Sequence, residues 1–262
     1  MAGIFVNFLL IWTLIFGALP QNPGPSVTGA LAASGGGVTW TLIQHVHNWT
    51  CTSKSSGNLT CTVTASSTVS GDGLLLALSY YEAITSTATG PSFVSASGDS
   101  TWTHNAGCSN YMHNNTNTSF EGVDCAYIAS ATGGATSLSM VYNFANVDGS
   151  DAVYADLELY EVRRSSGSAS LDVLNSTNAV SNCTSCTGPT LAITGTDYVA
   201  EWAAACNPPG VPGSPWTNPS DVDSTNNQIA GFLGALNQTS VSALTYTQSP
   251  SCGFAAGAFG FK

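Results

Sequence analysis

Apolar and polar residues alternate in short runs from residue 38 onward, and Gly, Pro, Asn and Ser cluster between the runs. Alternation with a period of two is typical of a strand with one buried face, and few segments carry the period of a helix. The pattern predicts strands at 38–47, 59–65, 73–83, 92–95, 101–105, 122–131, 136–144, 152–162, 190–193, 198–205, 243–247 and 253–261. So many short strands around one core predict an all-β protein, a jelly-roll-like sandwich of two antiparallel sheets with disulfide-stapled loops.

The chain divides into three parts. Residues 1–20 are almost entirely apolar and predict either a signal peptide or a hydrophobic N-terminal segment retained as an anchor or for assembly. Residues 21–37 are rich in Gly, Pro and Ala and are interpreted as a spacer or tail. Residues 38–262 then make a single β-sandwich domain. Inside it, 207–227 carry five prolines without periodicity, so we expect a long surface loop there.

Charge is scarce, and its sign excludes several kinds of partner. Only 7% of the residues are charged, and four basic residues stand against fifteen acidic ones. A nucleic-acid-binding protein needs a basic stripe to replace phosphate counterions, and binding to anionic lipid headgroups also needs basic residues. We therefore expect no nucleic-acid partner, and membrane contact only through the N-terminal segment. Hydrophobic residues make up 43% of the chain, enough for a packed core, so the low charge does not indicate disorder.

The eight cysteines fall into sequence pairs, which predicts disulfide bonds and an oxidising, extracellular or cell-surface location. The sequence leaves the connectivity open, and nearest-neighbour pairing gives Cys51–Cys61, Cys108–Cys125, Cys183–Cys186 and Cys206–Cys252. The first pair brackets "CTSKSSGNLTC", which predicts a hairpin closed by a disulfide. Only "CTSC" at 183–186 has the spacing of half a zinc site, and the sequence holds no second half.

The most charged stretch of the chain is "YADLELYEVRR" at 154–164. In a strand, Leu157 and Leu159 mark the core face, so Asp156 and Glu158 are expected to point to water. Glu161 has the inward phase, and a buried carboxylate needs backbone N–H groups or an arginine as partners. Asp156 and Glu158 could also lie at the spacing of a glycosidase pair. We favour a core strand with a solvated acidic face and assign no catalytic residue.

Two patterns resemble metal sites. His45 and His47 share one strand face at a chelating spacing, and His104, His113 or a carboxylate would have to supply a third ligand. The runs "DGSD" (148–151) and "DVDSTNN" (221–227) resemble fragments of calcium loops. Neither pattern is complete, so we expect no metal and no cofactor, with a structural calcium ion as the alternative. The chain has no nucleophile elbow, phosphate-binding loop or dinucleotide fingerprint.

Trp216 lies in the Pro- and Gly-rich loop, where its burial is not guaranteed. An exposed indole can stack on a sugar ring while nearby Asn218, Asp221 and Asp223 bind hydroxyl groups. The alternative is that the indole packs the loop onto the sandwich. Three other tryptophans have strand phases and are expected in the core: Trp40, Trp102 and Trp202. Seven N-glycosylation sequons begin at Asn48, Asn58, Asn114, Asn117, Asn175, Asn182 and Asn237.

Seven segments follow one another in a familiar order: "GLLLALSYYEA" (73–83), "SFVSASGDSTWTH" (92–104), "VDCAYIASATGGATSLSMVYNF" (123–144), "ADLELYEVRR" (155–164), "SLDVLNSTNAV" (170–180), "TGTDYVAEWAAA" (194–205) and "AAGAFGFK" (255–262). In this order the chain resembles a family of secreted bacterial jelly-roll-like β-sandwich surface domains without assigned activity. The resemblance covers roughly residues 38–262 and implies the fold and a surface location, and no shared catalytic residues come with it. The chain departs from the family pattern at 99–101, at 163–164 and in its eight cysteines.

Three functions from different classes are compatible with the sequence. A structural or adhesive extracellular protein fits the low charge, the cysteines and the Gly-rich tail, which could add a strand to the open sheet edge of another copy. A carbohydrate-binding module would use Trp216, and a glycoside hydrolase on a sandwich scaffold has the least support. We expect a non-catalytic subunit of a surface filament or layer assembled by strand exchange, whose partners are copies of itself or surface glycans.

Overall fold

The computed structural model describes residues 37–53, 57–83, 90–114, 119–144, 153–178, 182–205, 229–232 and 237–262. Its strands form four antiparallel sheets, here named A to D. Sheet A has the order β1 (Trp40–Ser53), β9 (Val153–Arg164), β3 (Gly73–Ala83), β7 (Ser119–Ile128), β5 (Thr103–His104), and β6 (Asn110–Asn114) also pairs with β7. Sheet B has the order β2 (Gly57–Thr64), β8 (Ser137–Phe144), β4 (Ser92–Ser97).

The remaining strands build two more sheets. Sheet C has the order β10 (Leu171–Asn178), β15 (Phe254–Phe261), β12 (Tyr198–Ala205), β13 (Ile229–Phe232), and sheet D pairs β11 (Cys183–Thr187) with β14 (Thr245–Cys252). The one helical element described is a 3₁₀ turn, η1 (Ala106–Cys108). Among the residues with described positions, no helix has the length and apolarity needed to cross a bilayer.

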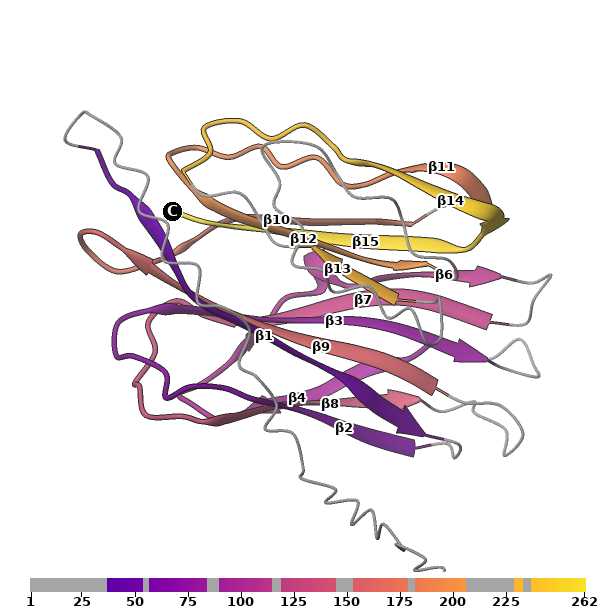
Figure 1. Cartoon of the computed structure of the whole chain (residues 1–262), viewed down its shortest axis with the longest axis horizontal. Helices are drawn as coiled ribbons and strands as arrows, with labels where there is room; N and C mark the ends of the chain where they lie inside the picture. The colour runs from indigo at the N-terminus through magenta and orange to yellow at the C-terminus, as the bar shows by residue number, and fades with distance from the viewer. Residues whose placement is uncertain are drawn as a thin grey trace, which may run out of the picture.

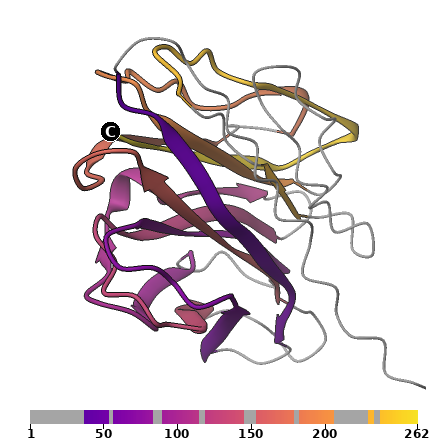
Figure 2. The same cartoon turned by 60° about the vertical axis from the view of Figure 1, so that its left-hand side comes forward.

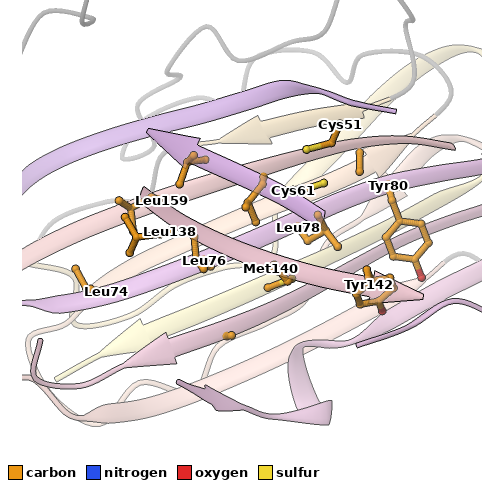
Figure 3. Close-up of a cluster of buried hydrophobic side chains, with 14 of the residues drawn as sticks. Cys51, Cys61, Leu74, Leu76, Leu78, Tyr80, Leu138, Met140, Tyr142 and Leu159 are labelled. Carbon is orange, nitrogen blue, oxygen red and sulfur yellow. The ribbon is translucent and has the colours of Figure 1, made fainter. Parts of the chain in front are cut away.

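The sheets are stacked in the order B, A, C, D (Figure 1). Three apolar clusters fill the three spaces between them. One cluster joins sheets A and B, and Figure 3 shows its leucines with Met140, Tyr80 and Tyr142. The second, around Trp202, Phe259 and Phe261, joins sheets A and C, and the third joins sheets C and D. The expected all-β antiparallel sandwich is confirmed, and it has more layers than the two sheets indicated by the sequence.

Sheet A is the central layer, and its sequence has the composition that this position requires. In β3 the run Leu74 to Leu78 is completely buried, with even positions packed toward sheet B and odd positions toward sheet C. A strand covered on both faces needs apolar side chains at successive positions, because no face is left for water. The long diagonal strand β1 is an edge strand of this layer and pairs only with β9 among the described strands (Figure 2).

The hairpin predicted across residues 51–61 is wrong. β1 pairs with β9 in sheet A, whereas β2 pairs with β8 in sheet B, so the two strands are not hydrogen-bonded neighbours. The chain passes from sheet A to sheet B between β1 and β2. A turn signal between two β-rich arms predicts a change of direction but does not determine whether the arms pair with each other.

The other predicted strands agree with the observed strands to different extents. The predicted bounds of β3 and β12 agree with the structure, and the other paired strands differ from theirs at one or both ends. The strand predicted at 190–193 is reduced to a single bridge between Leu191 and Val241. Four strands have no counterpart in the prediction: β6, β10, β11 and β13. Three of them have five residues or fewer, and in the longer β10 polar residues break the alternation.

Candidate functional site

The acidic strand β9 lies inside the protein, so the prediction that its acidic face is solvated is wrong. Asp156 and Glu158 are 1% and 2% exposed, while Leu157 and Leu159 on the opposite face are fully buried. The leucines contact sheet B, and the acidic face, which includes Tyr160, lies under sheet C. The alternation separated the two faces correctly. It contained no information about the third sheet that covers the second face.

Buried carboxyl groups are the main chemical feature of the interior. Nine acidic residues in the described part of the chain are buried: Asp72, Glu82, Glu121, Asp124, Asp156, Glu158, Glu161, Asp197 and Glu201. Such groups must be hydrogen-bonded, paired with a cation, or protonated. Burial raises the pKa of Glu121 to about 7, although the Ser119 hydroxyl donates to its carboxyl at 2.8 Å. Burial also raises the pKa of Glu201 to about 8, and the Tyr246 hydroxyl donates to its Oε1 at 2.6 Å.

His45, Glu158 and Tyr160 form a cluster between sheets A and C. His45 Nε2 lies 3.4 Å from Glu158 Oε2, and the Tyr160 hydroxyl donates to the same oxygen. The His45 ring stacks on the Tyr160 ring with centroids 4.4 Å apart, and its side chain is only 9% exposed. A carboxylate that orients an imidazole is an arrangement found in proton transfer. Here both groups are enclosed, so the arrangement fixes β1 against β9.

The two other histidines proposed as metal ligands lie elsewhere. His104 is 3.0 Å from Asp124 on the face of sheet A that contacts sheet B, and its ring stacks on Phe93. His113 stacks on Phe120. Neither joins His45 and His47, and no group of three or more potential metal ligands occurs among the described residues. The acidic runs at 148–151 and 221–227, considered for calcium, lie outside the described residues.

Glu161 is buried, as its phase predicted. It accepts a hydrogen bond from the backbone N–H of Val69 at 2.7 Å and another from the Gln44 side chain. Arg163 binds the neighbouring Asp72 instead, through Nε at 2.8 Å and Nη2 at 2.9 Å. Burial raises the pKa of Glu161 against these two hydrogen bonds. The expected backbone partner is therefore present, while the arginine neutralises a different carboxylate.

A second charged cluster, at the end of sheet C, was missed by the sequence analysis. It consists of Asp172, Thr194, Asp197 and Lys262. Lys262 Nζ lies 2.9 Å from Asp172 Oδ1, and Asp197 lies beside Asp172 and shifts its pKa. Apart from an aspartate that interrupts the apolar pattern of "SLDVLN", nothing local marks these residues. Their meeting depends on the pairing of β10 with β15.

Two of the predicted disulfides are closed, Cys108–Cys125 and Cys183–Cys186. Cys51 and Cys61 are buried thiols in hydrogen-bond contact, with their sulfurs next to each other in Figure 3. This contact lowers the pKa of Cys51 and raises that of Cys61. Their bond stays a prediction, as does Cys206–Cys252, because Cys206 and the side chain of Cys252 lie outside the description.

The other sequence-derived candidates are distributed as follows. The loop residues proposed for glycan binding lie outside the described residues: Trp216, Asn218, Asp221 and Asp223. Trp40 and Trp202 are buried and Trp102 packs on the core between sheets A and B, as predicted. Asn58 and Asn175 are exposed sequon positions, and Asn48, Asn182 and Asn237 are partly buried. The Asn117 backbone and the side chains of Asn114 and Asn117 are not described.

Comparison with known proteins found no similar protein. No family model, no curated protein and no solved structure matches this chain.

Proposed function

We propose that this protein is a non-catalytic extracellular structural or adhesive protein, a subunit of a surface filament or layer in which one copy donates a strand to the next. The observation that carries the proposal is the enclosure of its carboxyl groups between the sheets. An acid that acts on an external substrate must reach that substrate. Asp156 and Glu158, the pair considered for glycoside hydrolysis, are instead packed under sheet C at 1% and 2% exposure.

Open sheet edges support assembly. Among the described strands, β4 pairs only with β8, and Val94 in β4 is 46% exposed where the register shifts between Phe93 and Ser95. An edge strand offers unpaired backbone groups to an extended segment of another chain. The donor in this proposal is segment 1–37, which is apolar at its start and rich in Gly and Pro at its end.

The composition supports an extracellular location. Two disulfides close within the described residues, and closed disulfides are typical of oxidising compartments. The chain carries four basic residues, and at least two of these, Arg163 and Lys262, are engaged with carboxylates. A surface with so few free cations offers little attraction to a nucleic acid or an anionic membrane.

Negative-stain electron microscopy and light scattering of the full chain test the proposal. We expect ordered filaments or layers from the wild type, and monomers from Val94→Lys, because a charge on an edge strand opposes pairing. Val69→Lys is the matched control, since Val69 is a valine of similar exposure (39%) outside the strands and its variant should still assemble. Deletion of residues 1–36 should also give monomers.

Two results would overturn the proposal. Dispersed particles of the wild type under all conditions would remove assembly as the function. Assembly of Val94→Lys as efficient as that of the wild type would remove β4 as the acceptor edge. If dispersed wild-type protein bound a glycan array and Trp216→Ala did not, the function would be carbohydrate binding instead.

A further inference from the structure

One end of sheet C brings an amine and two carboxyl groups into contact. Lys262 Nζ is 2.9 Å from Oδ1 of Asp172 and 3.4 Å from the Thr194 hydroxyl. Thr194 donates its backbone N–H to Oδ2 of Asp172 at 2.6 Å and its hydroxyl to Oδ1 at 2.5 Å. Asp197 lies beside Asp172, close enough for each carboxyl group to shift the pKa of the other.

The two carboxyl groups of this cluster are in different protonation states. Their side chains are 1% and 0% exposed, and two neighbouring buried carboxyl groups do not both ionise readily, because like charges repel and burial disfavours the charged form. Burial raises the pKa of Asp197 to about 7. Burial alone would also raise the pKa of Asp172, but hydrogen bonds from Thr194 and Lys262 outweigh it and hold the pKa at about 2. Below about pH 7, therefore, Asp197 is the group that carries the proton, and Asp172 is the carboxylate that faces the lysine.

The backbone holds the groups in place. Ser170 and Lys262 exchange two backbone hydrogen bonds, at 3.0 and 2.9 Å. The register of β10 against β15 shifts between Leu171 and Val173, and such a bulge at Asp172 re-aims its side chain. Asp197 is fixed by two backbone bonds to Gln238, at 2.8 and 2.9 Å. Fixing two reacting groups at contact distance removes a large part of the activation barrier to a condensation, because no bimolecular encounter is needed.

From this geometry we propose that Lys262 and Asp172 become joined by an amide bond that the folded protein forms by itself, with Asp197 as the assisting acid. The Lys262 ammonium first gives a proton to the Asp172 carboxylate, and the free amine then attacks the carbonyl carbon. A C–N bond forms, a C–O bond breaks and one water leaves. The lysine nitrogen loses two protons and the departing oxygen gains two, so no oxidant, reductant or co-reactant is needed.

Each neighbouring group has a defined part in this step. The Thr194 backbone N–H is placed to stabilise the negative charge that develops on Oδ2 during attack, as in an oxyanion hole. Asp197 donates its proton to the departing oxygen and takes one back from the nitrogen, so it is regenerated. The Lys262 side chain is 48% exposed, which leaves the water a path to solvent. The bond would fasten the end of β15 to β10, and it does not depend on the assembly proposed above.

Mass spectrometry tests the proposal directly. The full chain is produced in a bacterial cytosol, where N-glycans are not added, then purified, unfolded, reduced, alkylated and cut with trypsin. Cleavage after Arg164 releases 165–262 as one piece, because this segment contains no other basic residue before Lys262. We expect the wild-type fragment to be lighter than its sequence by the mass of one water, with fragmentation placing the link on Asp172 and Lys262.

Two variants separate the amide from the simple ion pair. Lys262→Arg keeps the charge pair but has no primary amine, and Asp197→Asn keeps the shape but not the acid, so both fragments should have the full mass. Circular dichroism confirms that each variant is folded before digestion. A wild-type fragment of full mass from folded protein means an ion pair only and overturns the proposal. A water loss that persists in Lys262→Arg also overturns it, because another group would then be responsible. A water loss that persists in Asp197→Asn would refute the assigned role of Asp197.

Discussion

Replacing Glu201 by Gln tests whether the sheets enclose neutral carboxyl groups. Glu201 lies on β12, is fully buried, and accepts a hydrogen bond from the Tyr246 hydroxyl at 2.6 Å. Burial raises its pKa from 4.5 to about 8, although the hydrogen bond from Tyr246 favours the charged form. The folded protein therefore holds a proton at neutral pH that the unfolded chain releases.

The sign and size of the effect follow from this difference in pKa. A raised carboxyl pKa contributes stability that is complete below pH 4.5 and is lost as the pH rises through about 8. At about 1.4 kcal/mol per pH unit, Glu201 costs the fold on the order of 3 kcal/mol at pH 7 and on the order of 5 kcal/mol above pH 8. Gln keeps the oxygen that accepts from Tyr246 and has no proton to lose. Glu201→Gln should therefore stabilise the protein by about 3 kcal/mol at pH 7 and have little effect at pH 4.

Urea unfolding followed by tryptophan fluorescence at pH 4, 7 and 9 measures the difference, since Trp202 is buried next to Glu201 in the sequence. A thermal melt at pH 7 should show a rise of roughly 6–12 °C, at about 2–4 °C per kcal/mol for a domain of this size. Parallel stability profiles for wild type and variant across this pH range would refute the reasoning. They would mean that Glu201 is ionised in the folded protein and reached by water.

Three further predictions concern other parts of the fold. Asp99→Asn should show the opposite pH dependence, because hydrogen bonds to the Asp99 carboxylate outweigh burial and lower its pKa. In urea titrations at neutral pH the variant should be about 1–2 kcal/mol less stable than the wild type, and the difference should fade as the pH falls below 3.8. Gly257→Ala should destabilise by about 1–3 kcal/mol in the same assay, because the new Cβ would lie 2.6 Å from the Trp202 ring; a neutral result would mean that the ring moves freely. Oxidation by a small-molecule disulfide should form the Cys51–Cys61 disulfide bond and raise the free energy of unfolding by about 2–4 kcal/mol. Neither cysteine should then be alkylated after unfolding, whereas Cys61 should stay reactive in Cys51→Ser.

The local pattern was sufficient for the strongest strands. The run 73–83 and the segment 198–205 were predicted with the observed bounds, because a short, mostly apolar run that contains aromatic residues is typical of a strand buried on both faces. β10 was missed because its register shift at Leu171/Val173 breaks the period of two and its C-terminal half is polar. β11 was missed because five residues of "CTSCT" carry too little apolar pattern to be recognised.

The candidate sites were harder to predict, and Asp156 and Glu158 show why. The sequence correctly separated them from Leu157 and Leu159, since side chains alternate along any strand. Whether a face meets water depends on a layer contributed by residues far along the chain, here β12 and β15. The same holds for Lys262 and Asp172, which are brought together only by the register of β15 on β10.

By itself, therefore, the sequence determined what is local: an all-β chain, the two faces of each clear strand and the inward phase of Glu161, and its nearest-neighbour cysteines gave the Cys108–Cys125 and Cys183–Cys186 pairs as predictions that the structure then closed. These features follow from backbone sterics, side-chain alternation and short loop closure, which neighbouring residues set among themselves. Only the tertiary structure decided how many sheets stack, which carboxyl groups lose their water, and which of them meet a lysine. Those outcomes depend on pairing between distant strands, because burial and hydrogen-bond partners are supplied by residues that no local window contains.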